Sequence, residues 1–252
     1  MAGCDWEVEV FPTVQSTQDM ARDIASSRPV RWLAVVADYQ ERGRGQQSRT
    51  WNAPAGKCLL MSALVRTQLP DNRARVLPAL ASLAAAEGIL VGTGVSVGLA
   101  WPNDLMIGKR KVGGVLTEAS WAGDTLEQTV IGIGINANIS SAKVPELAPN
   151  ATSLLAELGR PVDRNELAGR VLMHLGAGVG DLRDRSNAAG ELLDRWKQNL
   201  GLDGRTIRVS AGRHVATTGR VEAIDGNGTL VVDAGGTRLE LRAGYSSVEI
   251  ID

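Results

Sequence analysis

Apolar and polar residues alternate with different periods along the chain, and these periods predict its helices and strands. Short β-rich apolar runs, one of them an opening strand near the N-terminus, predict strands at residues 6–11, 32–39, 58–65, 95–101, 105–107, 112–119 and 129–136. Longer segments with helical spacing predict helices at residues 18–25, 76–90, 152–158, 164–175 and 188–200. The first of these helices follows Ser16 and Thr17, which are suited to cap it, and carries Asp19 in its first turn.

The pattern changes near residue 201. Five short strands are predicted at residues 206–209, 218–224, 229–232, 237–241 and 247–251. The turns between them have tight-turn sequences, such as Asp-Gly-Asn-Gly at residues 225–228. So many short strands in about fifty residues predict a small barrel of SH3 or OB type. We therefore predict a large domain over residues 1–200 and a small domain over residues 201–252.

Composition and charge exclude several classes of protein. Hydrophobic residues make up 44% of the chain and charged residues 22%, which excludes wholesale disorder. The net charge of −1 argues against a nucleic-acid coat or a polybasic membrane anchor, so any anion site must be a local cluster. Four glycines and Glu87 interrupt the apolar stretch at residues 77–101, which favours a buried helix, a turn and a strand over a membrane span.

Sulfur and imidazole chemistry is sparse. Cys4 and Cys58 are the two cysteines, too few for a disulfide framework, which fits a reducing cytosol. His174 and His214 stand far apart and give no zinc-ligand spacing. The first residues show neither a basic nor an apolar signal region, so the sequence predicts no secretory signal and a cytoplasmic location.

Three segments at the edges of apolar strands carry candidate chemistry. The first is a polar loop after the strand at 32–39, in which Gly43 and Gly45 allow close backbone approach to a ligand and Arg42, Arg44 and Arg49 supply cations. Long loops inside compact domains tend to be functional. The alternative is a solvated basic loop.

The other two segments lie further along the chain. Trp-Pro-Asn-Asp at residues 101–104, followed by Lys111 and two glycines, places a carboxylate and a lysine on either side of a hairpin. The alternative is a β-turn and an exposed basic hairpin. Gly-Ile-Gly-Ile-Asn at residues 132–136 is a bare strand ending in an amide that could read a base edge; the alternative is a tightly packed strand.

Together these segments resemble the biotin–protein ligases. The family pattern Gln-x-x-Gly-Arg-Gly-x-x-x-Arg-x-Trp stands at residues 40–51, and Trp-Pro-Asn-Asp, Lys-x-x-Gly (111–114) and Gly-x-Gly-x-Asn follow in the family's order. Ser16-Thr17 and the Ala-Thr-Ser-Leu at residues 151–154 also match, so the resemblance covers essentially the whole chain. It implies an α+β fold: a mixed sheet with helices, similar to class II aminoacyl-tRNA synthetases, plus a small SH3-like C-terminal barrel.

The resemblance also implies an activity. The family joins biotin to ATP as biotinyl-5′-adenylate and passes biotin to a lysine of a biotin carboxyl carrier protein of a biotin-dependent carboxylase. The motifs begin almost at residue 1, so the winged-helix DNA-binding domain of some members is expected to be absent and a repressor role disfavoured. We expect biotin and ATP as substrates, Mg²⁺ as a cofactor, no DNA or membrane partner, and either a monomer or a homodimer.

The resemblance assigns roles to individual residues. The implied catalytic residues are Lys111, Arg44, Arg49 and Asp104, with Lys111 between the biotin carboxylate and the α-phosphate and Asp104 orienting Lys111 or coordinating Mg²⁺. The implied biotin-binding residues are Ser16, Thr17, Gln40, Gly43, Arg44, Gly45, Gln46, Lys111, Gly114 and Gly132. The implied ATP- or adenylate-binding residues are Arg49, Trp51, Asn103, Lys111 and Asn136, the two asparagines reading adenine. The arginine-rich loop is expected to order when ligand binds.

The chain departs from the family pattern at some positions. Ala100 and Gln46 stand where a lysine and an arginine are usual, and Arg42 could replace one of these cations. Ser48, Gln18 and Ala-Gly-Tyr at residues 243–245 are further departures. We therefore expect the adenylate to form but to be held more weakly. The competing functions are a catalytically weakened binding protein for biotin or its adenylate and, ranked last, a lipoate or octanoate transferase.

Overall fold

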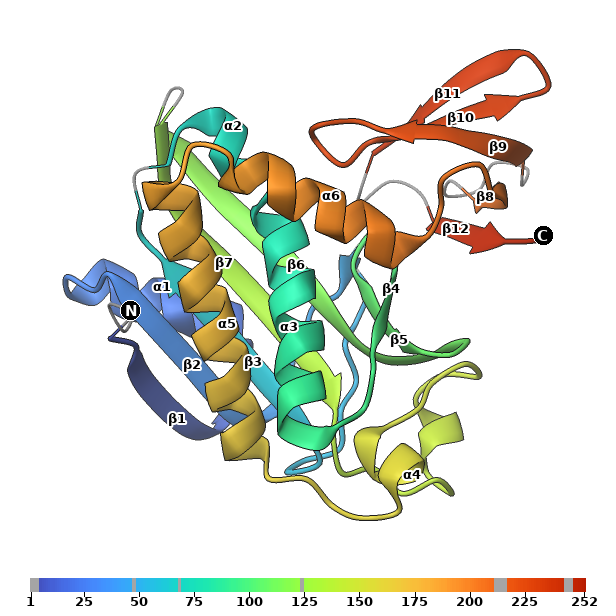
Figure 1. Ribbon diagram of the computed structural model, residues 1–252. Helices are drawn as coiled ribbons and strands as arrows, with labels where there is room; N and C mark the ends of the chain where they lie inside the picture. The colour runs from blue at the N-terminus through green and yellow to red at the C-terminus, as the bar shows by residue number, and fades with distance from the viewer. Residues whose placement is uncertain (1–4, 47–48, 68, 123–124, 211–216, 243–246) are drawn as a thin grey trace.

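The computed structural model describes residues 5–46, 49–67, 69–122, 125–210, 217–242 and 247–252. A seven-stranded sheet forms its larger part, in the order β1-β2-β3-β7-β6-β5-β4 (Figure 1). β1 and β2 are parallel, and the other neighbours are antiparallel. The strands are β1 Glu7–Val14, β2 Trp32–Gln40, β3 Cys58–Val65, β4 Gly98–Ala100, β5 Asp104–Ile107, β6 Arg110–Ala122 and β7 Thr125–Asn136.

Helices cover both faces of this sheet. They are α1 Thr17–Ser27, α2 Asp71–Ala74, α3 Leu77–Thr93, η2 Val144–Glu146, α4 Leu154–Leu158, α5 Arg164–Asp184 and α6 Ala188–Leu200. Leu64 of β3 packs with Ala21 and Ala25 of α1, whereas its neighbours Ala63 and Val65 belong to the core beneath α3 and α5. Because alternate side chains of a strand point to opposite faces, α1 lies on one face and α3 and α5 on the other (Figure 1).

One helical stretch in the described part of the chain, Asp71–Thr93, is long and apolar enough to cross a membrane. However, 67% of its most apolar window is buried inside the protein. Within this stretch α3 lies against α5, and a Cβ atom built on Gly88 would lie only 2.6 Å from Cγ2 of Val171. The stretch is therefore a core helix, as its interrupted apolar pattern predicts.

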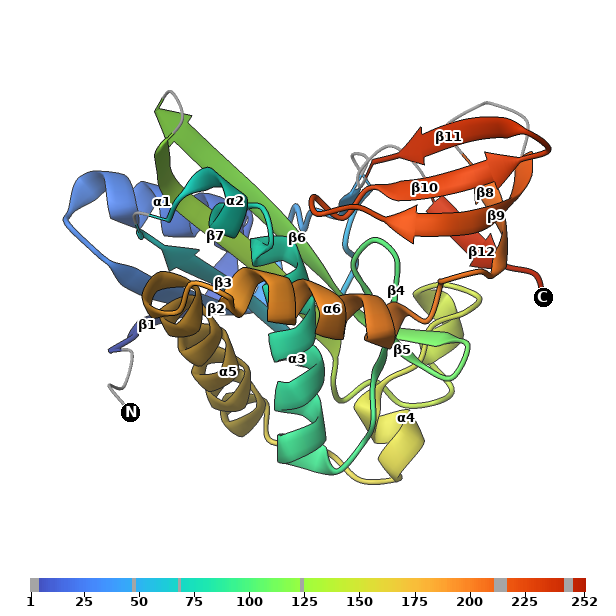
Figure 2. The same cartoon turned by 45° about the horizontal axis from the view of Figure 1, so that its top comes forward.

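The second sheet is antiparallel, with the order β11-β10-β9-β8-β12. Its strands are β8 Thr206–Ser210, β9 Thr217–Ile224, β10 Leu230–Ala234, β11 Thr237–Leu241 and β12 Ser247–Ile250. It lies beside the C-terminal end of α6, near the β4–β5 hairpin (Figure 2). The indole Nε1 of Trp101 donates to the carbonyl of Gly228 at 3.1 Å and joins the two sheets. The predicted α+β class with a small all-β C-terminal part is confirmed.

Some predicted bounds differ from the structure. The strand predicted at 95–101 is reduced to β4, because Gly94 ends α3 with a φ of 79° and only Gly98–Ala100 pairs with β5. The helix predicted at 164–175 continues to Asp184, through a glycine-rich stretch that packs on α3. Ser16 has the extended backbone of an N-cap residue, but its hydroxyl makes no capping hydrogen bond.

Candidate active site

A pocket of about 970 Å³ opens on the face of the large sheet that carries α1. A site of this volume falls in the range of small-molecule sites. Its wall includes β5, β6 and β7, the loop before β3 and part of the second sheet. Most of the predicted site residues line it together: Thr17, Gln40, Arg44, Gly45, Gln46, Arg49, Trp51, Asn103, Asp104, Lys111, Gly114 and Gly132.

Glycines on β7 make the floor of this pocket. A Cβ atom built on Gly134 would lie 2.6 Å from Cε2 of Trp51, and one built on Gly132 would lie 3.0 Å from Cδ of Gln18. Real Cβ atoms essentially never show the first distance, and the second is tighter than nine in ten real Cβ contacts. The glycines therefore let Trp51 and Gln18 lie directly on the strand. The strand is tightly packed here and lines the pocket at the same time.

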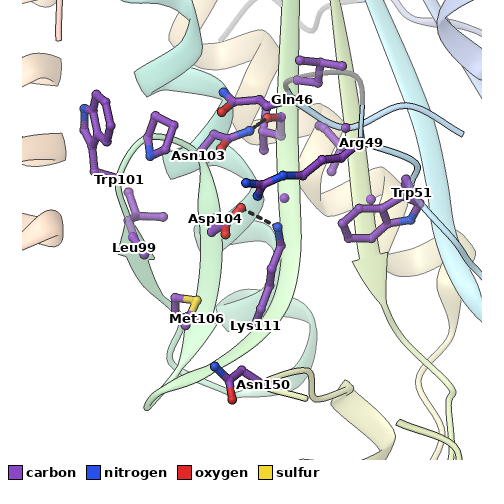
Figure 3. A pocket seen from close by; sticks show the side chains of 18 of the residues that line it. Gln46, Arg49, Trp51, Leu99, Trp101, Asn103, Asp104, Met106, Lys111 and Asn150 are labelled. Atoms are coloured by element: carbon purple, nitrogen blue, oxygen red, sulfur yellow. Dashed lines mark hydrogen bonds and ion pairs between the residues drawn. The ribbon is translucent and has the colours of Figure 1, made fainter. Parts of the chain in front are cut away.

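Lys111 and Asp104 form an ion pair inside the pocket. Nζ of Lys111 lies 2.6 Å from Oδ1 of Asp104, and both side chains are partly buried. Asp104 pairs in register with Gly114, and a Cβ atom built on Gly114 would lie in ordinary contact with the pair, 3.5 Å from Oδ1 of Asp104 and 3.6 Å from Nζ of Lys111. The guanidinium of Arg49 points toward the same place (Figure 3). Nζ of Lys111 also lies 5.7 Å from the ring centroid of Trp51, within cation–π range.

The Ala-Thr-Ser-Leu segment holds the backbone of Lys111. The amide of Lys111 donates to the carbonyl of Asn150 at 2.7 Å, and the amide of Thr152 donates to the carbonyl of Lys111 at 2.8 Å. The hydroxyl of Ser153 then accepts from the amide of Ala156 and caps α4. Asn150, which lines the pocket, and the motif that follows it therefore support the backbone of the lysine together.

The arginine-rich loop is folded back on itself. The amide of Trp51 donates to the carbonyl of Gly43 at 2.9 Å, and the amide of Gly45 donates to the carbonyl of Arg49 at 2.7 Å. A Cβ atom on Gly43 would lie 2.5 Å from the carbonyl oxygen of Trp51, so only glycine fits there. Gly43 thus shapes the loop, but it does not line the pocket.

Hydrogen-bonding groups gather where α1 begins. The amide and the hydroxyl of Thr17 both donate to Oε1 of Gln40, at 2.8 and 3.0 Å. Oγ of Ser62 lies 2.7 Å from the same hydroxyl. Oγ of Ser16 is buried and has no hydrogen-bond partner among the described residues. A polar ligand would satisfy such an orphaned hydroxyl.

The structure places some predicted site residues elsewhere. Asn136 is buried, lies outside the pocket lining, and donates its amide to the carbonyl of Thr152 at 2.9 Å. The geometry therefore gives no support to its predicted contact with adenine. Asn103 lines the pocket, but its amide donates to the carbonyl of Val115. Arg42 is exposed and outside the lining, so it does not replace a missing cation there.

Four predictions fall on residues that the structure does not describe. They concern Cys4, Ser48, His214 and the Ala-Gly-Tyr segment at 243–245, all outside the described residues.

Sequence reasoning missed several residues at the site. Gln18, noted above only as a departure from the family pattern, lines the pocket. Asp19 and Glu118 lie beside it in contact with Arg44, and Arg22 contacts both of these carboxylates. Glu118 could have been found, because it follows Gly114 at strand period two and so shares its face. Residues of the second sheet that line the pocket, such as Arg205 and Asp252, carry no local signal.

Comparison with known proteins identifies the family. The model of the biotin/lipoate A/B protein ligase family matches residues 10–136. A biotin–[acetyl-CoA-carboxylase] ligase of Mycobacterium tuberculosis is 30% identical over 250 residues, which cover 96% of this chain and 90% of that protein. The chain belongs to the biotin protein ligase family. The resemblance that its motifs predict is thereby confirmed.

Other members of the biotin protein ligase family agree over different lengths. The bifunctional ligase/repressor BirA of Bacillus spizizenii is 36% identical over 161 residues. This alignment covers 64% of the chain and spans half the length of that relative. The biotin protein ligase of Aquifex aeolicus, solved in complex with biotin and ATP, has a TM-score of 0.75 at 25% identity. That match covers 97% of this chain and 99% of the Aquifex chain.

Proposed function

We propose that this chain activates biotin with ATP and transfers it to a lysine of a biotin carboxyl carrier protein. The observation that carries the proposal is the Lys111–Asp104 ion pair, which lies with Arg49 in one pocket above a glycine floor. Relatives named for acetyl-CoA carboxylase support the carrier of that carboxylase as the acceptor. The matching family model is named for both biotin and lipoate, whereas these relatives are named for biotin, which favours biotin over lipoate or octanoate as the acyl group.

The first step joins two anions. A carboxylate oxygen of biotin attacks the α-phosphorus of ATP, the bond from that phosphorus to the bridging oxygen breaks, and pyrophosphate leaves with the electron pair. The ammonium of Lys111, oriented by Asp104, neutralises charge where the carboxylate and the phosphate meet. Arg49 supplies a second cation in the same pocket. Preorganised cations of this kind stabilise developing charge without reorganising during the reaction.

The second step consumes the mixed anhydride. The amine of the carrier lysine attacks the acyl carbon, an amide bond forms, the bond from acyl carbon to phosphate oxygen breaks, and AMP leaves. The nitrogen loses its proton to solvent or to the phosphate. Lys111 neutralises the departing phosphate as it did the incoming one.

Magnesium fits this site as a companion of the nucleotide. The described residues hold no group of three or more His, Cys, Asp or Glu side chains placed to bind a metal. Mg²⁺ is commonly held by one or two carboxylates together with substrate phosphates, and Asp104 could supply such a carboxylate. When bound, the ion would neutralise charge on the phosphates.

The test uses biotin, Mg-ATP and a biotin carrier domain, with streptavidin detection of the labelled carrier. We expect Lys111→Ala to lower the rate of labelling at least about 100-fold, the usual effect of losing a preorganised charge at a reacting centre. Lys57→Ala is the matched control, because Lys57 is exposed and outside the pocket lining. Unchanged labelling by a folded Lys111→Ala protein would contradict the mechanism.

A weakened binding protein for biotin or its adenylate is the second candidate. Gln46 and Ala100 line the pocket and stand where the family usually has cations, which favours this alternative. The same assay separates the two functions. Pyrophosphate release without labelled carrier, or biotin binding without pyrophosphate release, would favour the second candidate over the ligase.

A further inference from the structure

Five polar side chains from three segments meet beside the pocket, where α1 approaches the sheet. We call them the Arg44 cluster. Its members are Gln18, Asp19 and Arg22 of α1, Arg44 of the loop, and Glu118 of β6. They come from positions up to 100 residues apart in the sequence. The cluster is therefore a purely tertiary feature.

Two guanidinium groups bridge the same two carboxylates in this cluster. Nη1 of Arg44 lies 2.7 Å from Oδ1 of Asp19, and its Nη2 lies 3.2 Å from Oε2 of Glu118. Arg22 repeats the arrangement, with Nη1 at 3.0 Å from Oδ1 of Asp19 and Nη2 on Oε2 of Glu118. Nε2 of Gln18 adds a hydrogen bond to Glu118 at 2.8 Å. Glu118 is thus the common acceptor of α1 and the loop.

Fold stability does not account for this arrangement. The paired side chains are 30–46% exposed, and exposed ion pairs contribute little to the free energy of unfolding. The cluster does join the loop to the rest of the protein, because both terminal nitrogens of Arg44 are held from outside the loop. The Nε of Arg44 is buried and has no hydrogen-bond partner among the described residues, so one donor is left for a ligand.

Anchoring Arg44 also fixes its neighbours in the loop. Two backbone hydrogen bonds, one from Trp51 to Gly43 and one from Gly45 to Arg49, tie the two arms of the loop together around Arg44. Arg49 and Trp51 line the part of the pocket that holds Lys111. A contact that fixes Arg44 on one arm therefore restrains Arg49 and Trp51 on the other.

We propose that Asp19 and Glu118 are positioning residues that clamp the loop through Arg44 and set how long the pocket retains biotinyl-adenylate. The inference rests on the proposed function, because the adenylate is the ligand retained. The two carboxylates act through Arg44 and are not assigned a part in the chemical steps. Their removal should therefore change the release of the adenylate and leave its formation nearly unchanged.

The experiment measures formation and release separately. Adenylate is formed from biotin and ATP labelled at the α-phosphate, and the label that stays with the protein is followed over time after rapid desalting. We expect Glu118→Gln to release the adenylate about five to ten times faster, as expected when one charge-assisted contact is lost. The single-turnover rate of adenylate formation should change less than about twofold. Glu127→Gln is the matched control, since Glu127 is an exposed glutamate on β7 outside the pocket lining.

Two further variants test the clamp itself. Arg44→Lys keeps the charge but loses the fork that reaches both carboxylates and the Nε donor left for a ligand, so it should speed release at least as much as Glu118→Gln does. Adding Glu118→Gln to Arg44→Lys should speed release no further than Arg44→Lys alone, because the link from the loop to Glu118 is already broken. Glu118→Asp, which keeps the charge, should recover part of the retention. Asp19→Asn takes the place of Glu118→Gln should the latter fail to fold.

The outcomes separate this inference from the proposed function. A wild-type chain that forms no adenylate would overturn the proposed function, and the clamp with it. A wild-type chain that forms adenylate, while Glu118→Gln retains it as long, would overturn the clamp alone. Additive effects of Arg44→Lys and Glu118→Gln, or equal losses in formation and retention, would also overturn the clamp.

Discussion

Single glycines decide the shape of the pocket. Gly43 allows the loop to close on Trp51, and Gly134 allows the indole of Trp51 to lie on β7. Both contacts are closer than a Cβ atom permits. The glycines of the motifs are therefore explained by packing between parts of the protein, and they open the floor of the pocket as a consequence.

Gly134→Ala tests this explanation. The added methyl group would meet the ring of Trp51 at 2.6 Å, so the indole must move away from the strand. We expect the KM for ATP to rise roughly tenfold, because Trp51 is assigned to the nucleotide, and the protein to lose about 1–3 kcal/mol of stability through overpacking. Steady-state pyrophosphate release and thermal unfolding measure the two effects. Gly190→Ala is the control: it meets nothing within 4 Å on α6 and should leave the KM unchanged while raising Tm slightly.

Cys58 should be chemically inert in the folded protein. Burial raises the pKa of its thiol from 9.0 to about 12. In a Cys4→Ser background, alkylation by iodoacetamide at pH 8.5 should be on the order of 100-fold slower for the folded than for the unfolded protein, because the thiolate is the nucleophile. Comparable rates in the two states would show that the thiol is accessible.

The same raised pKa predicts a loss of stability in alkaline solution. Between pH 9 and 12 the unfolded chain ionises this thiol while the folded protein keeps it protonated. The folded state then binds more protons than the unfolded state. The stabilising contribution of the protonated Cys58 thiol is therefore complete below pH 9, and above pH 9 the free energy of unfolding falls by up to about 1.4 kcal/mol per pH unit. Denaturant unfolding at pH 8 to 11, with Cys58→Ala as the reference, measures the difference. An equal pH dependence in both proteins would contradict it.

The limits of sequence reasoning at this scale are visible at Asn136. Its place at the end of a bare strand suggested an amide available to a base. In the structure that amide donates a hydrogen bond to the carbonyl of Thr152, a residue 16 positions further along the chain. A strand pattern tells which face a side chain occupies, but it does not tell which segment will cover that face. Lys111 and Asp104, in contrast, lie in one hairpin, so their meeting was predictable.

At the scale of elements, local patterns predicted the strands and the longer helices but not the short α2 and η2, and tertiary contacts set the lengths of the elements. The helix α5 continues past residue 175 although glycines follow, because Gly178 lies against α3. A Cβ atom there would be 2.2 Å from Cδ1 of Leu80. Glycine has a low helix propensity, and here the close contact between α5 and α3 outweighs it. No local pattern contains this information.

The loop between β2 and β3 carries a prediction of its own. Gln46 lines the pocket at a position where the family pattern has an arginine, so one cation fewer would face the proposed adenylate. We expect Gln46→Arg to lengthen the retention of labelled adenylate by roughly tenfold, the effect of about 1.4 kcal/mol. Desalting and counting measure it, with Gln128→Arg on β7, outside the pocket lining, as the control. Equal retention by wild type and Gln46→Arg would show that Gln46 does not weaken binding.

At the scale of the whole molecule, the pocket is composite. Arg205, Val248, Glu249 and Asp252 belong to or flank the second sheet, yet they line the same pocket as Lys111. The predicted domain boundary near residue 200 stays a prediction, placed between the end of α6 and the start of β8. With a boundary at this place, residues from both domains line the pocket. The second sheet could therefore order the nucleotide or receive the carrier.

Arg205 distinguishes these two roles. Its Nε lies 2.6 Å from Oδ1 of Asp252, and its guanidinium holds the pKa of that carboxyl below the usual value. The guanidinium thus already binds an anion at the edge of the pocket, and the phosphates of ATP are anions that could compete for it. If the sheet orders the nucleotide, Arg205→Ala should raise the KM for ATP about fivefold to tenfold and leave the KM for biotin within about twofold. Arg238→Ala, on β11 and outside the pocket lining, should change neither. A raised KM for the carrier domain at an unchanged KM for ATP would assign the sheet to the acceptor protein.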